Sequence, residues 1–146
     1  MAEHAYEVEV NWSGATTGYR SYSRNHEVNT PGRPPIPGTA DPKFRGDTTR
    51  WNPEQLLVAS VSECHMLWYL HLCAEAGVVV TTYRDNALGI MNDVQFLQVT
   101  LRPQITITDP AKVEVAEQLH VEAHKKCFIA NSVNFPVAHE PTITAE

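Results

Sequence analysis

Two cysteines, Cys64 and Cys127, are the residues of this chain whose types and positions suggest chemistry. Each lies in a helix-like segment with ionisable neighbours, Glu63 and His65 beside the first and Lys126 beside the second. A thiol on a mostly apolar helix is usually a small core residue. Two thiols with ionisable neighbours also allow thiol redox chemistry.

A reactive Cys64 requires a cation close to its sulfur. The residue lies about three turns into its predicted helix, where the N-terminal dipole does little. Burial alone would raise the thiol pKa and leave Cys64 inert. An arginine is the natural source of the charge, and Arg20, Arg24 and Arg50 are the candidates, which the residues alone do not rank.

The other two thiols have different expected roles. Cys73 is half a helical turn out of phase with Cys64, so these two cannot form a disulfide and Cys73 is predicted to be structural. Cys127 ends a predicted helix, where the dipole disfavours a thiolate. That position suits a thiol drawn into a disulfide better than a primary nucleophile.

A metal site is a competing interpretation. His120, His124 and Cys127 recur at helical spacing on one face, and His65 is adjacent to Cys64. Zinc sites use such His/Cys sets. Because no CxxC pair or HExxH element accompanies them, we expect neither a bound metal nor a cofactor.

Composition limits the classes of function. The 146 residues predict one domain over residues 1–146, and 42% hydrophobic with 19% charged residues is typical of a globular chain. A net charge of -6 argues against a nucleic-acid partner, which needs a basic surface. The acidic N-terminus is not a secretory signal, and three cysteines make no disulfide framework, so we expect a cytoplasmic protein. The apolar run over 67–80 is interrupted by His71, Glu75 and Gly77, which predicts no membrane span.

The elements that must position the thiols follow from periodicity. Alternation over residues 6–12 predicts a half-buried strand, with a return strand over 19–28. The proline-dense segment 30–42 is expected not to pair, and to serve as a lid, a rim or an interface arm. Asn52 and Pro53 predict a helix start, and Gly77 its end. This helix is apolar nearly all round, so we expect it between a sheet and something else, which could be another subunit.

The remaining segments complete an α+β order. Residues 78–92 and 94–108 predict a hairpin, in which Pro103 indicates an edge or a bulge. Asp109 and Pro110 predict a second helix, and 134–144 a last strand. The core-facing stripe of the second helix is expected to comprise Val113, Ala116, Leu119, Ala123 and Cys127.

These motifs together resemble the OsmC/Ohr family. The resemblance rests on the run Asn52-Pro-Glu-Gln-Leu56 before Cys64, on a helix ending Ala123-His-Lys-Lys-Cys127, and on a strand segment Thr17-Gly-Tyr-Arg20. It covers essentially the whole chain in the right order. It implies the OsmC-like fold, with antiparallel sheets packed around a long central helix and two chains intertwined in a homodimer.

The resemblance also implies a thiol-dependent peroxidase acting on organic hydroperoxides. Cys64 would be the peroxidatic thiolate and Cys127 the resolving thiol. Arg20 would stabilise the thiolate and Glu54 would hold Arg20 through an ion pair. The Cys64 sulfenic acid would condense with Cys127, and an external dithiol or a lipoylated protein would reduce the disulfide.

Several residues depart from the family pattern. Glu63 and His65 flank the first cysteine, and Phe128 and Ala130 stand where the family commonly has proline and serine. Arg24, by strand alternation on the face of Arg20, is the other candidate for the thiolate's cation. These departures keep a second interpretation open, in which a non-catalytic homodimer binds a hydrophobic ligand at its interface.

Overall fold

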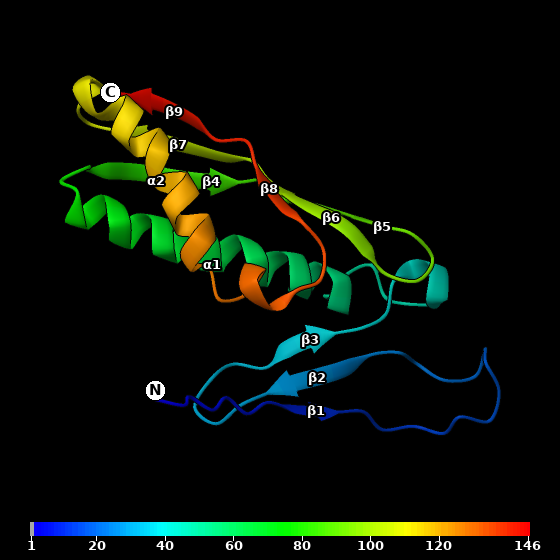
Figure 1. The fold of residues 1–146 in the computed structure, drawn as a ribbon. Helices are drawn as coiled ribbons and strands as arrows, with labels where there is room; N and C mark the ends of the chain where they lie inside the picture. Colours follow the sequence, from blue (N-terminus) through cyan, green and yellow to red (C-terminus); the bar gives the residue numbers. More distant parts are fainter. Residues whose placement is uncertain (1) are drawn as a thin grey trace. The chain divides into compact units, whose positions relative to one another are not determined.

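The computed structural model describes residues 2–146 and divides into two compact units. The first unit ends at Leu56 and the second begins at Leu57. The long helix α1 (Pro53–Glu75) starts in the first unit and continues through the second (Figure 1). The single domain expected over residues 1–146 stays a prediction.

The first unit contains a three-stranded antiparallel sheet. Its order is β1 (Glu9–Asn11), β2 (His26–Asn29) and β3 (Ile36–Gly38). The predicted half-buried strand over residues 6–12 is wrong in its extent and its burial. The apolar side chains meant to face a core are all exposed: Tyr6, Val8, Val10 and Trp12.

The return strand is also shorter than expected, because its first part forms a turn. Ser21 donates from both its amide and its hydroxyl to the carbonyl of Gly18, at 3.0 and 2.8 Å. Such local side-chain bonds compete with a strand ladder. The strand expected over Thr17–Arg20 is therefore wrong, and so is the argument that alternation places Arg20 and Arg24 on one face.

The proline-dense segment does pair, contrary to expectation. β3 forms antiparallel pairs with β2 that place Pro37 opposite Glu27. Pro37 lacks an N–H, and its carbonyl accepts from the amide of Trp51 at 2.9 Å. Proline is tolerated in a strand at the edge of a sheet, and β3 is such a strand. The short 3₁₀ helix η1 (Pro42–Phe44) follows.

The limits predicted for α1 are confirmed by its caps. The Asn52 side chain accepts from the amide of Gln55 at 2.8 Å, and the Gln55 side chain accepts from the amide of Asn52 at 3.1 Å. This reciprocal pair is a capping box. Gly77 ends the helix with φ of 72°, a left-handed conformation that glycine adopts without strain.

The second unit contains two three-stranded sheets. One has the order β4 (Val80–Asp85), β7 (Pro103–Ile107), β9 (Thr142–Ala145), and the other β5 (Leu88–Met91), β6 (Phe96–Leu101), β8 (Val137–His139). The predicted two-stranded hairpin is thus split between sheets. Each sheet is mixed, because β8 and β9 pair in parallel with β6 and β7.

The prediction that Pro103 lies on an edge strand is wrong. β7 is the central strand of its sheet. Pro103 is the first residue of that strand, a position where a missing N–H is tolerated. The amide of the preceding residue, Arg102, donates instead to the Asp85 side chain at 2.7 Å, where β4 ends.

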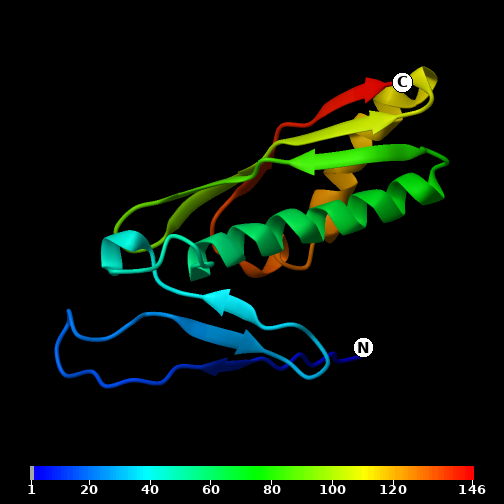
Figure 2. The ribbon, with the colours of Figure 1, turned by 180° about the vertical axis from the view of Figure 1, so that it is seen from behind.

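Helix α2 (Val113–Lys126) follows the 3₁₀ helix η2 (Pro110–Lys112) and leads to η3 (Ala130–Ser132). The predicted start at Asp109 and Pro110 is therefore a 3₁₀ turn that continues as α2. Helix α2 crosses α1 (Figures 1 and 2). The core between helices and strands comprises Tyr69, Cys73, Val78, Ile105, Ile107, Ala116 and Ala123.

Helix α1 is less covered by its own chain than its composition predicted. Only every fourth residue is fully buried, namely Val61, His65, Tyr69 and Cys73. By length and composition alone the helix also suffices to cross a membrane, with a mean hydropathy of 1.2 over 18 residues. The core helices of soluble proteins meet the same criterion. Outside this stripe, Leu67 is 62% exposed.

Candidate functional site

The second unit brings together the two cysteines singled out in the sequence. Cys64 on α1 is half-buried, Cys127 at the end of α2 is buried, and both are free thiols. Burial raises the pKa of Cys127 to about 11, and the adjacent Cys64 thiol raises it further. A hydrogen bond from the amide of Ala130 to the Cys127 sulfur, at 3.4 Å, acts in the opposite direction and lowers this pKa. Cys127 is therefore protonated at neutral pH and lies beside Cys64.

Cys73 belongs to the core and not to this contact. It is buried beside Tyr69, and burial raises the pKa of its thiol. An inert, packed thiol at this position agrees with the structural role predicted for it.

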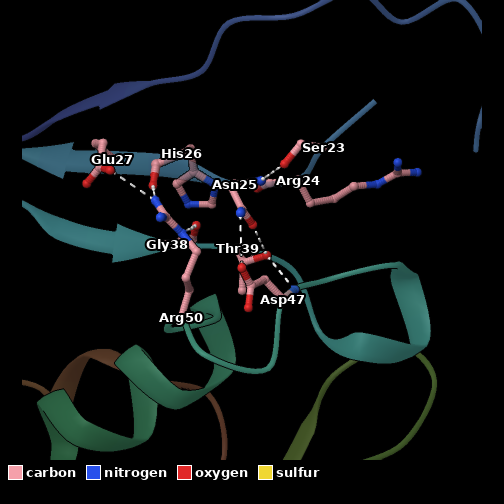
Figure 3. A network of polar contacts seen from close by, with 9 residues as sticks. All are labelled: Ser23, Arg24, Asn25, His26, Glu27, Gly38, Thr39, Asp47 and Arg50. Atoms are coloured by element: carbon pink, nitrogen blue, oxygen red, sulfur yellow. Dashed lines mark hydrogen bonds and ion pairs between the residues drawn. The ribbon is translucent and has the colours of Figure 1, made fainter. Parts of the chain in front are cut away.

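Two of the three candidate arginines are held within the first unit. The Arg50 guanidinium donates to the carbonyls of Gly38 and His26, at 2.9 and 2.6 Å, and pairs with Glu27 at 3.0 Å (Figure 3). The Arg24 guanidinium donates to the carbonyls of Tyr22 and Tyr19, at 2.6 and 2.7 Å. It also lies 3.7 Å from the centroid of the Tyr22 ring, a cation–π geometry.

A polar network beside Arg50 fixes the chain ahead of α1. Thr39 donates to the side chain of Asn25 at 2.9 Å, and Asn25 donates to Asp47 at 3.1 Å (Figure 3). The amide of Asp47 donates back to the Thr39 hydroxyl at 3.0 Å. Hydrogen bonds from Thr49, then Asn25, lower the pKa of Asp47. This network ties β2 to the segment that leads into α1.

Arg20 and Glu54 remain as the predicted charged pair. Arg20 is exposed, and within residues 2–146 its guanidinium makes no hydrogen bond or ion pair. Glu54 lies in the first turn of α1, and its Oε2 atom is buried without a hydrogen-bond partner among the described residues. Both belong to the first unit and both cysteines to the second, so their juxtaposition stays a prediction.

A pair of buried histidines is the feature that sequence reasoning missed. His65 and His120 are 1% and 0% exposed, and His65 Nε2 lies 3.0 Å from His120 Nδ1. Burial, followed by the charges of neighbouring histidines, lowers the pKa of His65 to about 4 and that of His120 to about 3. Both rings are therefore neutral at pH 7. His120 lies one helical turn after Ala116 on the core-facing stripe, a spacing that could have revealed its burial.

The histidines gather without forming a metal centre. His139 on β8 and His124 on α2 also lie close to the pair. The distance between ring centroids is 5.8 Å for His65 and His139, and 5.6 Å for His124 and His139. Among residues 2–146, no group of three or more His, Cys, Asp or Glu side chains is placed to hold a metal ion. The set of His120, His124 and Cys127 therefore has no metal-binding geometry in this structure.

The sequence and the structure both resemble known proteins. Residues 46–142 match the family model described as OsmC-like protein. An OsmC-like protein of unknown function from Vibrio cholerae, VCA0330, has 33% identity and a TM-score of 0.84, with 97% of this chain and 99% of that chain covered. An organic hydroperoxide resistance protein OsmC from Legionella pneumophila has 18% identity and a TM-score of 0.65, with 97% and 99% covered. A putative organic hydroperoxide resistance protein from Vibrio cholerae, with captopril bound in one active site, has 23% identity and a TM-score of 0.63, with 97% and 93% covered. No curated protein matches the sequence.

Proposed function

Because the chain belongs to the OsmC-like family, we propose that it is a thiol-dependent peroxidase that reduces organic hydroperoxides to alcohols. The observation that carries this proposal is the contact of Cys64 with Cys127, two free thiols on different helices. The names of the Legionella pneumophila and Vibrio cholerae hydroperoxide resistance proteins support it, because they share the fold.

In the proposed reaction Cys64 attacks the terminal oxygen of the hydroperoxide. The O–O bond breaks, an S–O bond forms, and the alkoxide takes a proton and leaves as the alcohol. The Cys127 thiol then attacks the Cys64 sulfenic acid, which forms a disulfide and releases water. An external dithiol or a lipoylated protein returns both thiols to the reduced state.

The charge that Cys64 needs is assigned to Arg20 with Glu54. Arg24 and Arg50 are engaged within their own unit, whereas Arg20 is free of polar contacts there. The unpartnered Oε2 atom of Glu54 is a suitable acceptor for a guanidinium. A positive charge beside the sulfur lowers a thiol pKa and raises the thiolate fraction at neutral pH.

The homodimer is proposed from the apolar surface that the chain leaves uncovered. Leu67 on α1 is 62% exposed, and Phe128, just after α2, is 67% exposed. These large exposed apolar side chains are what a second copy of the chain would cover in the proposed homodimer. Light scattering is expected to give twice the chain mass, and a monomer at micromolar concentration would contradict the dimer. A reducing, cytoplasmic location fits three free thiols.

Stopped-flow kinetics with cumene hydroperoxide test the proposal. The wild-type protein is expected to consume the hydroperoxide in the presence of a dithiol, and Cys64→Ser to lose this activity. Cys73→Ala, which removes the core thiol, is the matched control and is expected to retain it. Equal rates for wild type and Cys64→Ser would refute the peroxidase.

The second candidate is a non-catalytic homodimer that binds a hydrophobic ligand at its interface. The observation that favours it is the bulky, exposed Phe128 beside Cys127. The thiol pKa separates the two candidates. A Cys64 pKa above the reference value of about 8.5 supports the binding protein, and a lower value supports the peroxidase.

A further inference from the structure

The two thiols of the candidate site differ in how far they are open to solvent. Cys127 is 1% exposed, whereas Cys64 is half-buried. A helix covers its own backbone, so the open part of Cys64 on α1 is its side chain. The proposed peroxidase also requires that a hydroperoxide reaches this sulfur. Of the two sulfurs, Cys64 is therefore the one that a second molecule can approach.

Hydrogen bonds fix Cys127 in the turn that follows α2. Its amide donates to the carbonyl of His124 at 3.4 Å, and its carbonyl accepts from the amide of Asn131 at 3.0 Å. Its sulfur accepts from the amide of Ala130 at 3.4 Å. The amide, the carbonyl and the sulfur of Cys127 are thus all engaged close to the residue itself. The side chain must break the bond to Ala130 before it can turn towards solvent.

The residues on either side of Cys127 both lie against Trp68 of α1. The rings of Trp68 and Phe128 form a T-shaped pair, with centroids 5.5 Å apart and planes at 71°. The ammonium group of Lys126 lies 5.5 Å from the centroid of the Trp68 ring, a cation–π geometry. Trp68 follows Cys64 by about one helical turn. Helix α1 therefore carries both the sulfur that Cys127 meets and the ring that holds its two neighbours.

The disulfide of the proposed cycle has two sulfurs at which a reductant could open it. A thiolate attacks one sulfur, and the other sulfur leaves. Leaving ability favours attack on Cys127, because burial raises the pKa of Cys127 and a thiol of high pKa leaves slowly. The amides of Ala130 and Ile129 offset part of this effect, since their hydrogen bonds lower the same pKa. Access favours attack on Cys64.

Access decides between the two sulfurs. A raised pKa slows the departure of a sulfur, but a sulfur that no nucleophile reaches does not react at all. Cys127 is buried, and the bond to its sulfur and the contacts of its neighbours with Trp68 keep it so. The amide of Ala130 remains beside the Cys127 sulfur as a donor when that sulfur becomes a thiolate.

We propose that the external dithiol attacks Cys64 and that Cys127 is the leaving sulfur, an inference that rests on the proposed peroxidase. An S–S bond forms between the dithiol and Cys64 as the Cys64–Cys127 bond breaks. The electron pair of the broken bond goes to the Cys127 sulfur, which then takes a proton. The second thiolate of the reductant attacks the reductant's own bonded sulfur. The reductant thereby closes to its disulfide, and Cys64 is released as a thiolate.

Opening the disulfide with sulfite tests which sulfur is attacked. Sulfite converts the attacked sulfur to an S-sulfonate and frees the other as a thiol, and it has no second thiol to continue the cycle. Full-length Cys73→Ala, which keeps only Cys64 and Cys127, is oxidised with diamide and then mixed with sulfite. Early samples are quenched with acid, alkylated, digested with trypsin and analysed by mass spectrometry. Cleavage after Lys126 places Cys127 on a different peptide from Cys64.

In the folded protein we expect about tenfold more S-sulfonate on Cys64 than on Cys127, because access controls the exchange. The same oxidised protein unfolded in urea is the control. Both sulfurs are open there, so the two yields should agree within about threefold. A folded protein marked mainly on Cys127, or marked in the same ratio as the unfolded one, would overturn the assignment.

Failure of the proposed peroxidase gives a different result. Diamide forms the disulfide without a hydroperoxide, so the attacked sulfur is identified whether or not the protein is a peroxidase. Cumene hydroperoxide that the wild-type protein leaves unconsumed would refute the peroxidase alone. A protein in which diamide forms no disulfide between Cys64 and Cys127 would overturn the assignment of the attacked sulfur.

Discussion

The Tyr69 ring lies flat against His120, with centroids 3.8 Å apart and planes 12° apart. The contact joins α1 to α2 one turn away from the histidine hydrogen bond. The Tyr69 hydroxyl also bonds to the Ala116 carbonyl, so one side chain holds α2 by its face and by its edge. The position of His120 therefore depends on Tyr69, a residue for which the described hydrogen bonds include none to Cys64 or Cys127.

Replacing Tyr69 with phenylalanine should weaken the helix crossing without emptying the core. The ring remains, but the hydrogen bond from the Tyr69 hydroxyl to the Ala116 carbonyl is lost, which costs about 1 kcal/mol. Urea unfolding measures the loss as a lower midpoint at constant slope. Tyr6→Phe, at a residue that is 91% exposed, is the control and should leave the midpoint unchanged. Equal midpoints for the two variants would contradict the assigned bond.

Acid should destabilise the protein through the buried histidines. Their folded-state pKa values, about 4 for His65 and about 3 for His120, lie below the unfolded value of 6.5. The unfolded chain thus binds more protons below pH 6.5, so stability is retained above this pH and lost as pH falls from 6.5 towards 4. Between pH 7 and pH 5 each ring should contribute a loss of about 2 kcal/mol.

Urea unfolding at both pH values tests this dependence. In His120→Asn the loss between pH 7 and pH 5 should shrink by the contribution of one ring. A variant with the same pH dependence as wild type would show that His120 is not the group responsible.

Gly89 on β5 should tolerate no side chain. A Cβ atom there would lie 2.6 Å from Cγ2 of Val58 on α1 and 2.8 Å from the Phe96 ring. Both distances are below van der Waals contact, so Gly89→Ala is expected to cost about 1–3 kcal/mol. Gly18→Ala, whose nearest neighbour would be the Ser21 hydroxyl at 3.7 Å, is the matched control. Thermal unfolding distinguishes the two, and similar melting temperatures would refute close packing of α1 on β5.

Removing the resolving thiol should stop the proposed cycle after one oxidation. In Cys127→Ser, Cys64 is expected to persist as sulfenic acid and to advance to sulfinic acid with excess hydroperoxide. Intact mass spectrometry reads these states as additions of one and two oxygens. A second disulfide partner for Cys64 in this variant, with no gain of oxygen, would argue against the role of Cys127.

The sequence predicted those elements whose signals are local. Asn52, Pro53 and Gly77 define α1 because caps act within one turn of the residues they bond. The pairing of β8 with β6 and of β9 with β7 could not be predicted, because strand partners are chosen by long-range packing. Pro103 was misjudged for the same reason, since its type restricts hydrogen bonding but does not specify its neighbours.

The candidate site divides in the same way. The two cysteines could be chosen from their types and from the family motifs around them. His65 and His120 were noticed only as a departure and as a metal candidate, because nothing in their local spacing encodes a bond between residues this far apart in the chain. Their burial depends on the crossing of α1 and α2, which is a property of the tertiary fold.

That crossing also governs when the site comes into existence. Strands β4 to β7 lie between α1 and α2 in the sequence, so the ribosome completes all of them before Cys127 is made. A chain folding during synthesis holds Cys64 without its companion thiol for as long as those strands and α2 take to emerge. The thiol pair therefore cannot form until β4 to β7 and α2 have been made.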